Sequence, residues 1–242
     1  MPWRHESIGT SLIDTGSAGL QDLLVRYLRF DVDNPYVSRL KSYRAFRLGL
    51  RDDRFLRYVE QILTMLDVHE QKGTFFFRPR YTLPSRALIE LILGRGHEIG
   101  HHVDRTRDIS KMREEKAILE EAAGTVLGIT IHGRGLPVLS PTGDGYHDKY
   151  LSYCAELGYA YEGTGLQDEF DTYEKLVVFP AHTTLDRELS TSIRTHVMLL
   201  HPCRLLRNAS VREVFEKVLK AYRFVPMKEA LNHVHQPRFA LT

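Results

Sequence analysis

The sequence predicts a single α/β domain built on a parallel sheet. From Val25 onward, segments with the pattern of short buried strands alternate with amphipathic helical segments. No internal repeat, low-complexity tract or Ser/Gly linker divides the 242 residues. We therefore expect an N-terminal extension over residues 1–24 and one domain over residues 25–242, with a sheet that is either open or closed into a barrel.

The first half of this domain has the pattern of a strand followed by two helix–strand units. The segment "VRYLRFDVD" alternates apolar and polar residues before an Asn-Pro turn, which predicts a strand. The helix that follows shows an apolar stripe made of Phe55, Val59, Ile62, Leu63 and Leu66. "GTFFF" and "HEIGHHV" are the next strands, and the helix between them, "SRALIELILGRG", has a serine at its start and a glycine at its end.

The same alternation continues through the second half. Ser110 is expected to cap a helix that Gly128 ends, and "ITIHG" follows as a strand. A helix over residues 146–157 precedes three further strands in "YAYEG", "KLVVFP" and "THVMLLHP". Ser210 and Glu213 predict a capping box at the start of the last long helix. A short strand "RFV" and a helical turn "PMKEALN" close the domain.

The composition argues against several classes of partner. The sequence has 33 Lys and Arg residues and 31 Asp and Glu residues, which gives a formal charge of +2. This charge is too small to favour binding to nucleic acid or to an anionic lipid surface. Cys154 and Cys203 lack C-x-x-C spacing and are expected to be reduced thiols. The sequence shows no signal-peptide core and no apolar run of the roughly 18 residues that a membrane span needs. We expect a soluble, cytoplasmic protein, and the sequence leaves the oligomeric state open.

Acidic and imidazole side chains gather at the carboxyl ends of the expected strands. In chain order they are Asp31, Asp33, His101, His102, His132 and His201. Ligands bind at this edge in both open and closed parallel sheets, so we expect these side chains to converge. Carboxylate oxygen and imidazole nitrogen suit Zn²⁺ or a related divalent ion with an open position for water. The pattern predicts a hydrolytic metal centre in which one aspartate is a ligand and the other is the general base.

The two adjacent histidines are not expected to share a metal ion. Consecutive residues of a strand point to opposite faces, so His101 and His102 cannot both face the site. We expect His101 to pack behind His102 or to support it from the other side of the strand.

Five segments resemble the polysaccharide deacetylase family, the NodB-homology carbohydrate esterases of carbohydrate esterase family 4. They occur in the family's order over most of residues 25–232 and are "RFDVDNP", "GTFFF", "GHEIGHHVDRT", "THVMLLHP" and "RFVPMKEAL". The resemblance implies a single-domain, irregular (β/α) barrel with seven strands. It also implies metal-dependent removal of N- or O-acetyl groups from sugars, although some relatives act on other amides.

The resemblance assigns roles to four residues of this sequence. It implies that Asp31 is the catalytic base, Asp33 and His102 are metal ligands, and His201 is the catalytic acid. The sequence departs from the family at Thr106, where the family has its second histidine ligand. A threonine hydroxyl is a poor zinc ligand, so the ligand set is incomplete as written.

Three explanations of this gap are open. His132 is the preferred replacement, because it is an imidazole at the end of an adjacent strand. Asp104 or Asp108 is the second choice, since a carboxylate from the following loop can also complete a site. The third explanation is that no metal binds.

Four further residues are predicted to serve catalysis or substrate binding. Arg134 in "HGRG" is expected to face the oxyanion or the substrate. Arg78, next to the "GTFFF" strand, is expected to contact the substrate. His182 and Asp186 follow a strand end and are expected to line the substrate groove.

The sequence therefore predicts a metal-dependent carbohydrate deacetylase, with zinc as the expected metal. The expected substrate is an N-acetylated sugar precursor of a surface polysaccharide such as O-antigen or lipopolysaccharide. Thr106 favours one alternative, a catalytically inactive NodB-like binding protein. The "DVD" motif suggests another, a glycosyltransferase that holds Mg²⁺ and a nucleotide sugar, but the histidines at the strand ends have no place in that mechanism.

Overall fold

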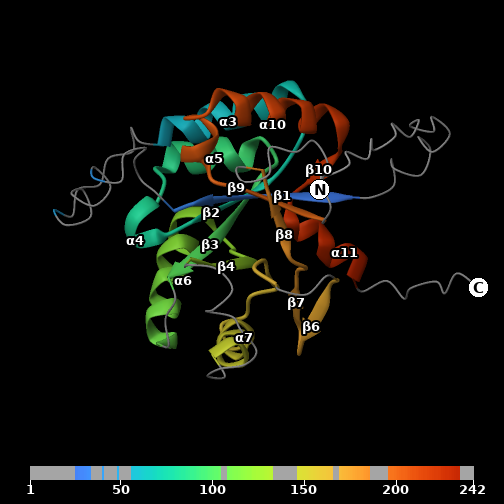
Figure 1. The fold of residues 1–242 in the computed structure, drawn as a ribbon. Coiled ribbons are helices and arrows are strands. Elements are labelled where there is room, and N and C mark those ends of the chain that lie inside the picture. The colour runs from blue at the N-terminus through green and yellow to red at the C-terminus, as the bar shows by residue number, and fades with distance from the viewer. Residues whose placement is uncertain are drawn as a thin grey trace, which may run out of the picture.

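One curled sheet forms the centre of the structure, a computed structural model (Figure 1). The structure describes residues 25–33, 40, 48, 56–104, 108–132, 146–165, 169–185 and 196–234. The strands are β1 (Arg26–Val32), β2 (Thr74–Phe77), β3 (Glu98–Asp104), β4 (Gly128–His132), β5 (Tyr161–Glu162), β6 (Asp171–Tyr173), β7 (Leu176–Val178), β8 (His182–Thr184), β9 (Val197–Leu200) and β10 (Phe224–Val225).

The strand order confirms the predicted parallel sheet. Along the sheet the order is β6-β7-β5-β4-β3-β2-β1-β9-β8, and β10 pairs with β1. All neighbouring pairs are parallel except the β6–β7 hairpin, which is antiparallel. In the described part of the chain, β6 and β8 are the edge strands at the two ends of this order. The expected barrel is therefore observed as a curled half-barrel.

The longer helices follow the curl of the sheet on its outer side, and one 3₁₀ helix, Met227–Ala230, packs inside the curl. In chain order, the described helices are α3 (Arg57–Val68), α4 (Pro79–Thr82), α5 (Arg86–Gly94), α6 (Ile109–Ala123), α7 (Tyr146–Glu156), α9 (Pro202–Leu205), α10 (Ala209–Ala221), the 3₁₀ helix η3 (Met227–Ala230) and α11 (Leu231–Val234). In Figure 1, α3, α5 and α10 lie above β1 and β2, and α6 and α7 lie in the lower part of the view, level with β6 and β7. The predicted stripe of α3 is buried from Val59 to Leu66, whereas Phe55 lies outside the described residues.

Alternate residues of β1 face two different environments. Leu28, Phe30 and Val32 belong to the core between the outer face of the sheet and the helices. There the Phe30 ring stacks on Phe75, with 4.6 Å between the ring centroids, and meets Phe215 of α10 edge-on. The intervening residues of β1 therefore point into the curl of the sheet.

The interior of the curl is mainly apolar toward the amino ends of the strands, where Thr74 also donates to the buried carboxylate of Glu98 at 2.8 Å. A second cluster fills this part of the interior and consists of Tyr27, Phe76, Tyr161, Val177, Phe179, Val197, Met227 and Ala230. Gly100 makes room for this packing, because a Cβ atom there would lie 2.4 Å from the ring of Phe76. The apolar filling leaves the carboxyl end of the interior to polar side chains.

The first turn of α5 agrees with the sequence prediction, whereas the limits of α6 differ from it. Ser85 caps α5 by accepting a hydrogen bond from the Leu88 amide at 3.3 Å. Asp108, not Ser110, caps α6, because its carboxylate precedes the helix and accepts the Ser110 amide at 2.9 Å. The helix ends at Gly124, which has a φ of 78°, a value that favours glycine.

The start of α10 also differs from the predicted capping box. Asn208 is the N-cap, and its side-chain oxygen accepts hydrogen bonds from the amides of Ser210 and Val211 at 3.1 and 3.4 Å. An Asx side chain on extended backbone can reach two free amides of the first turn. Asn208 therefore takes the role that we expected of Ser210 and Glu213.

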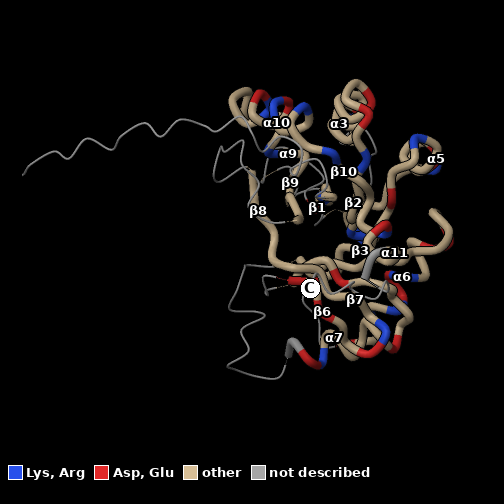
Figure 2. The backbone as a smooth tube through the Cα atoms, turned by 90° about the vertical axis from the view of Figure 1, so that its right-hand side faces the viewer, with Lys and Arg blue, Asp and Glu red and all other residues tan. Residues whose placement is uncertain are grey.

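Charged residues of both signs are interspersed over the described helices. Figure 2 shows acidic and basic positions alternating on α10, where Arg212, Glu213, Glu216 and Lys217 follow closely in the sequence. None of the described helices is both long enough and apolar enough to cross a membrane.

Candidate metal centre

Three of the predicted residues meet inside the carboxyl end of the curled sheet. Asp33 directly follows β1, His102 lies near the end of β3, and His132 ends β4. Each offers one ligand atom, and these atoms all lie within 4.8 Å of one another. Among the described residues, no other group of three or more His, Cys, Asp or Glu side chains meets this condition. We call Asp33, His102 and His132 the donor cluster.

The spacing of the donor cluster fits a divalent ion. The Nδ1 atom of His132 lies 3.3 Å from Asp33 Oδ2 and 3.3 Å from His102 Nε2. In a tetrahedral zinc site with bonds of about 2.0–2.1 Å, neighbouring donor atoms are about 3.3 Å apart. The other carboxylate oxygen of Asp33, Oδ1, is buried and has no hydrogen-bond partner among the described residues. A buried carboxylate beside two imidazoles is a donor set that zinc and related ions bind.

The surroundings of His102 favour the form of imidazole that binds a metal. Its ring is buried, and its Nδ1 atom lies 2.7 Å from the hydroxyl of Thr130 on β4. Burial lowers the pKa of His102 to about 3, even though the neighbouring Asp31 carboxylate opposes this shift. The ring is therefore neutral at ordinary pH. When Nδ1–H donates to Thr130, the lone pair of Nε2 is free to face the donor cluster.

A buried arginine holds Asp31. Nε and Nη2 of Arg29 donate to the two carboxylate oxygens of Asp31 at 2.8 and 2.6 Å, and Nη1 donates to the backbone oxygen of Gly163 at 2.6 Å. Burial raises the pKa of Asp31, but Arg29 and His102 outweigh burial and hold this pKa well below its usual range. Asp31 is thus an ionised, oriented carboxylate, and its Oδ2 atom lies 3.7 Å from His102 Nε2.

Arg29 and Thr130 are site residues that the sequence analysis missed. A signal for Arg29 was present, because Arg29, Asp31 and Asp33 are spaced two residues apart and so share one face of the strand. Thr130 likewise lies two residues before His132 on β4. Both supporting residues could have been found by taking every second residue before Asp31 and before His132, because these residues share a face of the strand.

His201 lies beside the donor cluster. It follows β9, and its Nε2 atom is 3.9 Å from Asp33 Oδ2. Its side chain is 16% exposed, so a group bound at the donor cluster can reach it. The structure therefore brings the residue predicted as the catalytic acid next to the residues predicted as metal ligands.

The structure places the three residues that could replace the missing histidine at Thr106 in different surroundings. His132 lies within the donor cluster. Asp104 instead accepts a hydrogen bond from Nη2 of Arg78, and Asp108 is an exposed helix cap. The geometry favours His132 over both carboxylates, and Thr106 itself lies outside the described residues.

Of the remaining predicted site residues, the structure describes Arg78 and His182, and neither is part of the donor cluster. Arg78 uses both terminal nitrogens within the protein, since Nη1 also donates to the backbone oxygen of Asp33 at 3.2 Å. His182 begins β8 and is the register partner of Val197, four residues before His201. Four residues correspond to about 13 Å along a strand. The predicted residues Arg134 and Asp186 lie outside the described residues.

His101 faces away from the donor cluster, as strand alternation predicts. Its Nδ1 atom lies 2.6 Å from the hydroxyl of Tyr159, and its Nε2 atom lies 3.4 Å from Glu115 of α6. The ring is completely buried between the sheet and the helices. His101 therefore packs on the outer face of β3.

Comparison with known proteins identifies the fold through solved structures. No protein-family model and no curated protein matches the chain. A Mycobacterium smegmatis protein assigned to the polysaccharide deacetylases matches 95% of this chain with 94% of its own, at 20% identity and a TM-score of 0.60. The chain has the fold of the polysaccharide deacetylases. The NodB-like fold implied by the sequence motifs is confirmed.

Two other similar structures show which other kinds of protein have this fold. An allantoinase has 14% identity and a TM-score of 0.60 over 88% of this chain and 90% of its own. A Bacillus anthracis protein described as a CE4 family pseudoenzyme has 16% identity and a TM-score of 0.53 over 87% of this chain and 66% of its own. A mutant of that pseudoenzyme is described as having restored enzymatic activity. The fold is therefore shared by active and inactive proteins.

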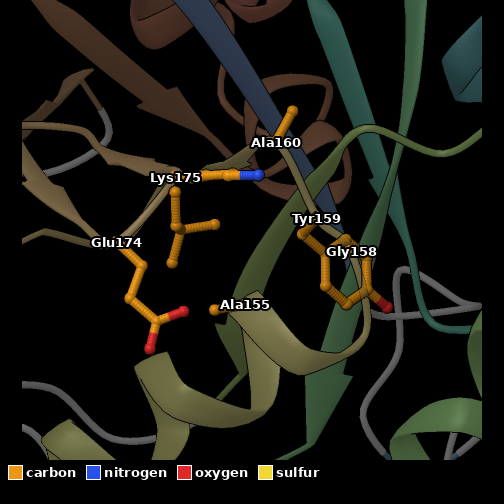
Figure 3. A pocket seen from close by; sticks show the side chains of 7 residues that line it. Ala155, Gly158, Tyr159, Ala160, Glu174 and Lys175 are labelled. Atoms are coloured by element: carbon orange, nitrogen blue, oxygen red, sulfur yellow. The ribbon is translucent and has the colours of Figure 1, made fainter.

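A pocket of about 690 Å³ lies away from the donor cluster (Figure 3). It is lined by residues from the end of α7, the start of β5 and the β6–β7 turn, namely Ala155, Gly158, Tyr159, Ala160, Glu174, Lys175 and Leu176. These residues precede or begin β5 and β7, whereas the donor cluster lies at the carboxyl ends of its strands. The pocket contains none of the predicted site residues.

Proposed function

We propose that the chain is a metal-dependent hydrolase that removes an acyl group, of the N-acetyl type, from a sugar. The observation that carries this proposal is the donor cluster, with ionised Asp31 near His102 and His201 near Asp33. The similarity of the fold to that of polysaccharide deacetylases supports the same chemistry. We further propose zinc as the metal and a precursor of a surface polysaccharide as the substrate.

The donor cluster would hold the metal ion. Asp33 would bind through a carboxylate oxygen, His102 through Nε2 and His132 through Nδ1. A divalent ion at this position would polarise the acyl carbonyl and make a nearby water more acidic. The ligands come from three strands of one sheet, β1, β3 and β4, or their ends; β3 and β4 are neighbours, and β2 lies between β3 and β1. The sheet would therefore fix their positions before a metal binds.

Asp31 is suited to accept the proton of the attacking water. Arg29 binds both of its oxygens but leaves further lone pairs, because a carboxylate has about four acceptor sites. One of these oxygens lies on the side of His102. Arg29 thus keeps Asp31 ionised and fixes its orientation, while the oxygen remains a proton acceptor.

His201 is suited to donate a proton to the leaving amine. A protonated imidazole carries an N–H that can be transferred to a leaving nitrogen, which is what a general acid in amide hydrolysis must do. Its imidazole borders the donor cluster and is accessible to a bound substrate. Asp31 and His201 would therefore act on the two protons that move when the amide bond is broken.

The glycosyltransferase alternative receives less support from this geometry. A DxD motif needs carboxylates that are free to bind Mg²⁺ and a nucleotide sugar. Here Arg29 engages both oxygens of Asp31, which leaves Asp33 as the carboxylate facing the two histidines. Pseudoenzymes share the fold, so the fold does not distinguish an active enzyme from an inactive binding protein. An experiment is needed to decide between them.

The decisive experiment measures metal content and acetate release in the same samples. We expect the wild-type protein to bind one zinc ion and to release acetate from N-acetylglucosamine oligomers or from a nucleotide-linked N-acetyl sugar. Asp33→Ala, His102→Ala and His132→Ala should lose both properties. Asp31→Asn should keep the metal and lose activity by about 10²–10⁴-fold, the usual effect of removing a general base.

A matched control is His69→Ala, which removes a histidine at the end of α3 and should change neither property. Zinc binding that survives in His132→Ala would place the third ligand elsewhere. A wild-type protein that binds no zinc would favour the inactive binding protein. Turnover that is unchanged in Asp31→Asn would remove this residue as the base.

A further inference from the structure

We propose that Arg78 and Asp104 form a positioning pair for the metal centre, and that this pair sets the metal affinity through Asp33 and His132. The proposal rests on the proposed function, because it requires a metal at the donor cluster. It gives Arg78 a different role from the substrate contact that the sequence suggested.

The guanidinium of Arg78 joins three strand ends. Arg78 directly follows β2 and is the N-cap of α4. Nη2 pairs with the carboxylate of Asp104 at the end of β3, and Nη1 donates to the backbone oxygen of Asp33 after β1. The guanidinium also lies over the ring of Tyr81, 4.1 Å from its centroid, which fixes its plane.

The backbone of Asp33 depends on these contacts because the strand has already ended. The last pair in the β1–β2 ladder joins Val32 to Phe77, so no strand partner holds the Asp33 peptide. Thr82 of α4 donates to the oxygen of Val32 at 2.6 Å and accepts the Arg78 amide at 2.9 Å. The carbonyl groups on both sides of the Asp33 α-carbon are therefore held by the Arg78–Thr82 turn.

Asp104 connects the pair to the second ligand. It is the register partner of His132 in the β3–β4 ladder, so the two residues end adjacent strands at the same level. Arg78 engages the carboxylate of Asp104 and keeps it away from the donor cluster. Without Arg78, this carboxylate would be an uncompensated charge beside His132 and a competing metal ligand.

The surroundings of the pair distinguish it from a surface ion pair. The side chains of Arg78 and Asp104 are 15% and 22% exposed, whereas those of Arg86 and Glu90 on α5 are 89% and 65% exposed. Residues that orient metal ligands from behind typically change metal affinity about 10–100-fold when they are removed. Arg86→Met therefore serves as the matched control for Arg78→Met.

The test is a zinc titration of the metal-free full-length protein against a competing chelator. We expect Arg78→Met and Asp104→Asn each to weaken zinc binding about 10–100-fold. The double variant should bind about as weakly as the weaker single variant, because the two side chains act as one unit. Arg86→Met should bind as the wild type does. Arg78→Lys keeps the charge but loses the fork geometry, so its affinity should fall between those of wild type and Arg78→Met.

Three outcomes would overturn the pair. Unchanged zinc affinity in Arg78→Met and Asp104→Asn would do so, and a raised KM with unchanged zinc affinity would make Arg78 a substrate contact instead. A wild-type protein that binds zinc without deacetylase activity overturns the proposed function alone, since the titration still reports on the pair. A wild-type protein that binds no zinc overturns both.

Discussion

At the scale of single residues, the geometry of parallel strands made most of the donor cluster predictable. Asp33, His102 and His132 were selected because each lies at the carboxyl end of a strand, and the structure brings their ligand atoms together. Their roles as ligands remain predictions. Arg78 was noticed for the same reason, yet its position at a strand end did not reveal that its partners lie within the protein.

Arg29 shows why the supporting residues were harder to predict. Arg29 fits the alternation of apolar and polar residues in this strand, but its role depends on a carboxylate two residues away and on a backbone oxygen of Gly163. The second contact spans 134 positions of the sequence and has no local signal. Only the tertiary structure shows that Arg29 joins β1 to the segment after β5.

Arg29→Met should destabilise the metal-free protein by about 3–5 kcal/mol, because it leaves the buried Asp31 carboxylate without its partner. Adding Asp31→Asn to this variant should recover part of the loss, since the uncompensated charge disappears. Urea unfolding of the two variants and the wild type measures both effects. A loss below about 1 kcal/mol in Arg29→Met would mean that the pair is not a buried ion pair in solution.

At the scale of elements, long periodic segments were predicted well. Among the short ones, the strand β10 and the helical turn after it were predicted, and several others were missed. The strands β1 to β4 and the helices α3, α5 and α10 have buried patterns that the sequence reveals. The three-residue strand β6 is largely exposed, and β8 is only partly buried, so neither has an apolar run. The single-turn helices α4 and α9 begin with proline directly after a site residue.

The cap of α10 offers a direct comparison of two residues. Asn208→Ala should destabilise the protein by about 1 kcal/mol, because two amides of the first turn lose their acceptor. Ser210→Ala should change stability by less than about 0.5 kcal/mol, as expected for an exposed position within the helix. Chemical denaturation measures both. A larger loss of stability in Ser210→Ala would support the capping box predicted from the sequence.

His97, just before β3, should make stability depend on pH. Its ring is 1% exposed, and its Nδ1 atom accepts the amide of Gly73 at 3.2 Å. Burial lowers the pKa of His97 to about 4, and the nearby Lys72 adds to this effect. The unfolded chain therefore binds a proton at a higher pH than the folded one. The contribution of His97 is complete above about pH 6.5 and falls as the pH drops toward 4.

The variant His97→Asn keeps an acceptor for the Gly73 amide and removes the titration. We expect wild-type stability to fall by up to about 3 kcal/mol more than that of the variant between pH 6.5 and pH 4. Other buried histidines contribute to both proteins, so the difference between the two curves is the informative quantity. Urea unfolding at several pH values measures it, and parallel curves would contradict the prediction.

At the scale of the whole molecule, the sequence predicted a parallel α/β sheet but could not decide from its pattern alone whether the sheet closes. Closure depends on strand tilt and on the ends of the path, which here are the short strands β6 and β8. The resemblance to the deacetylases implied a barrel, and the described residues form a curled half-barrel. The boundary predicted between residues 24 and 25 remains a prediction, because residues 1–24 lie outside the described residues.

Zinc should stabilise the whole fold, because its ligands come from three different places in the sheet. A zinc concentration 100 times the dissociation constant adds about 2.7 kcal/mol of stability. For a chain of this length, this corresponds to an increase of about 5–11 °C in Tm. Thermal unfolding with zinc and with chelator measures the shift. His132→Ala should show little of it, and an equal shift in that variant would contradict the proposed ligand set.

The alternation along β1 ties the chemistry of the site to the packing of the core. One face of this strand presents Tyr27, Arg29 and Asp31 to the interior, and the other presents Leu28, Phe30 and Val32 to the helices. Inserting or deleting a single residue before this segment, with the ladder unchanged, would exchange the two faces. The charged groups would then enter the main core while the apolar ones entered the site. In this strand, the same alternation of residues therefore sets both the packing of the core and the chemistry of the site.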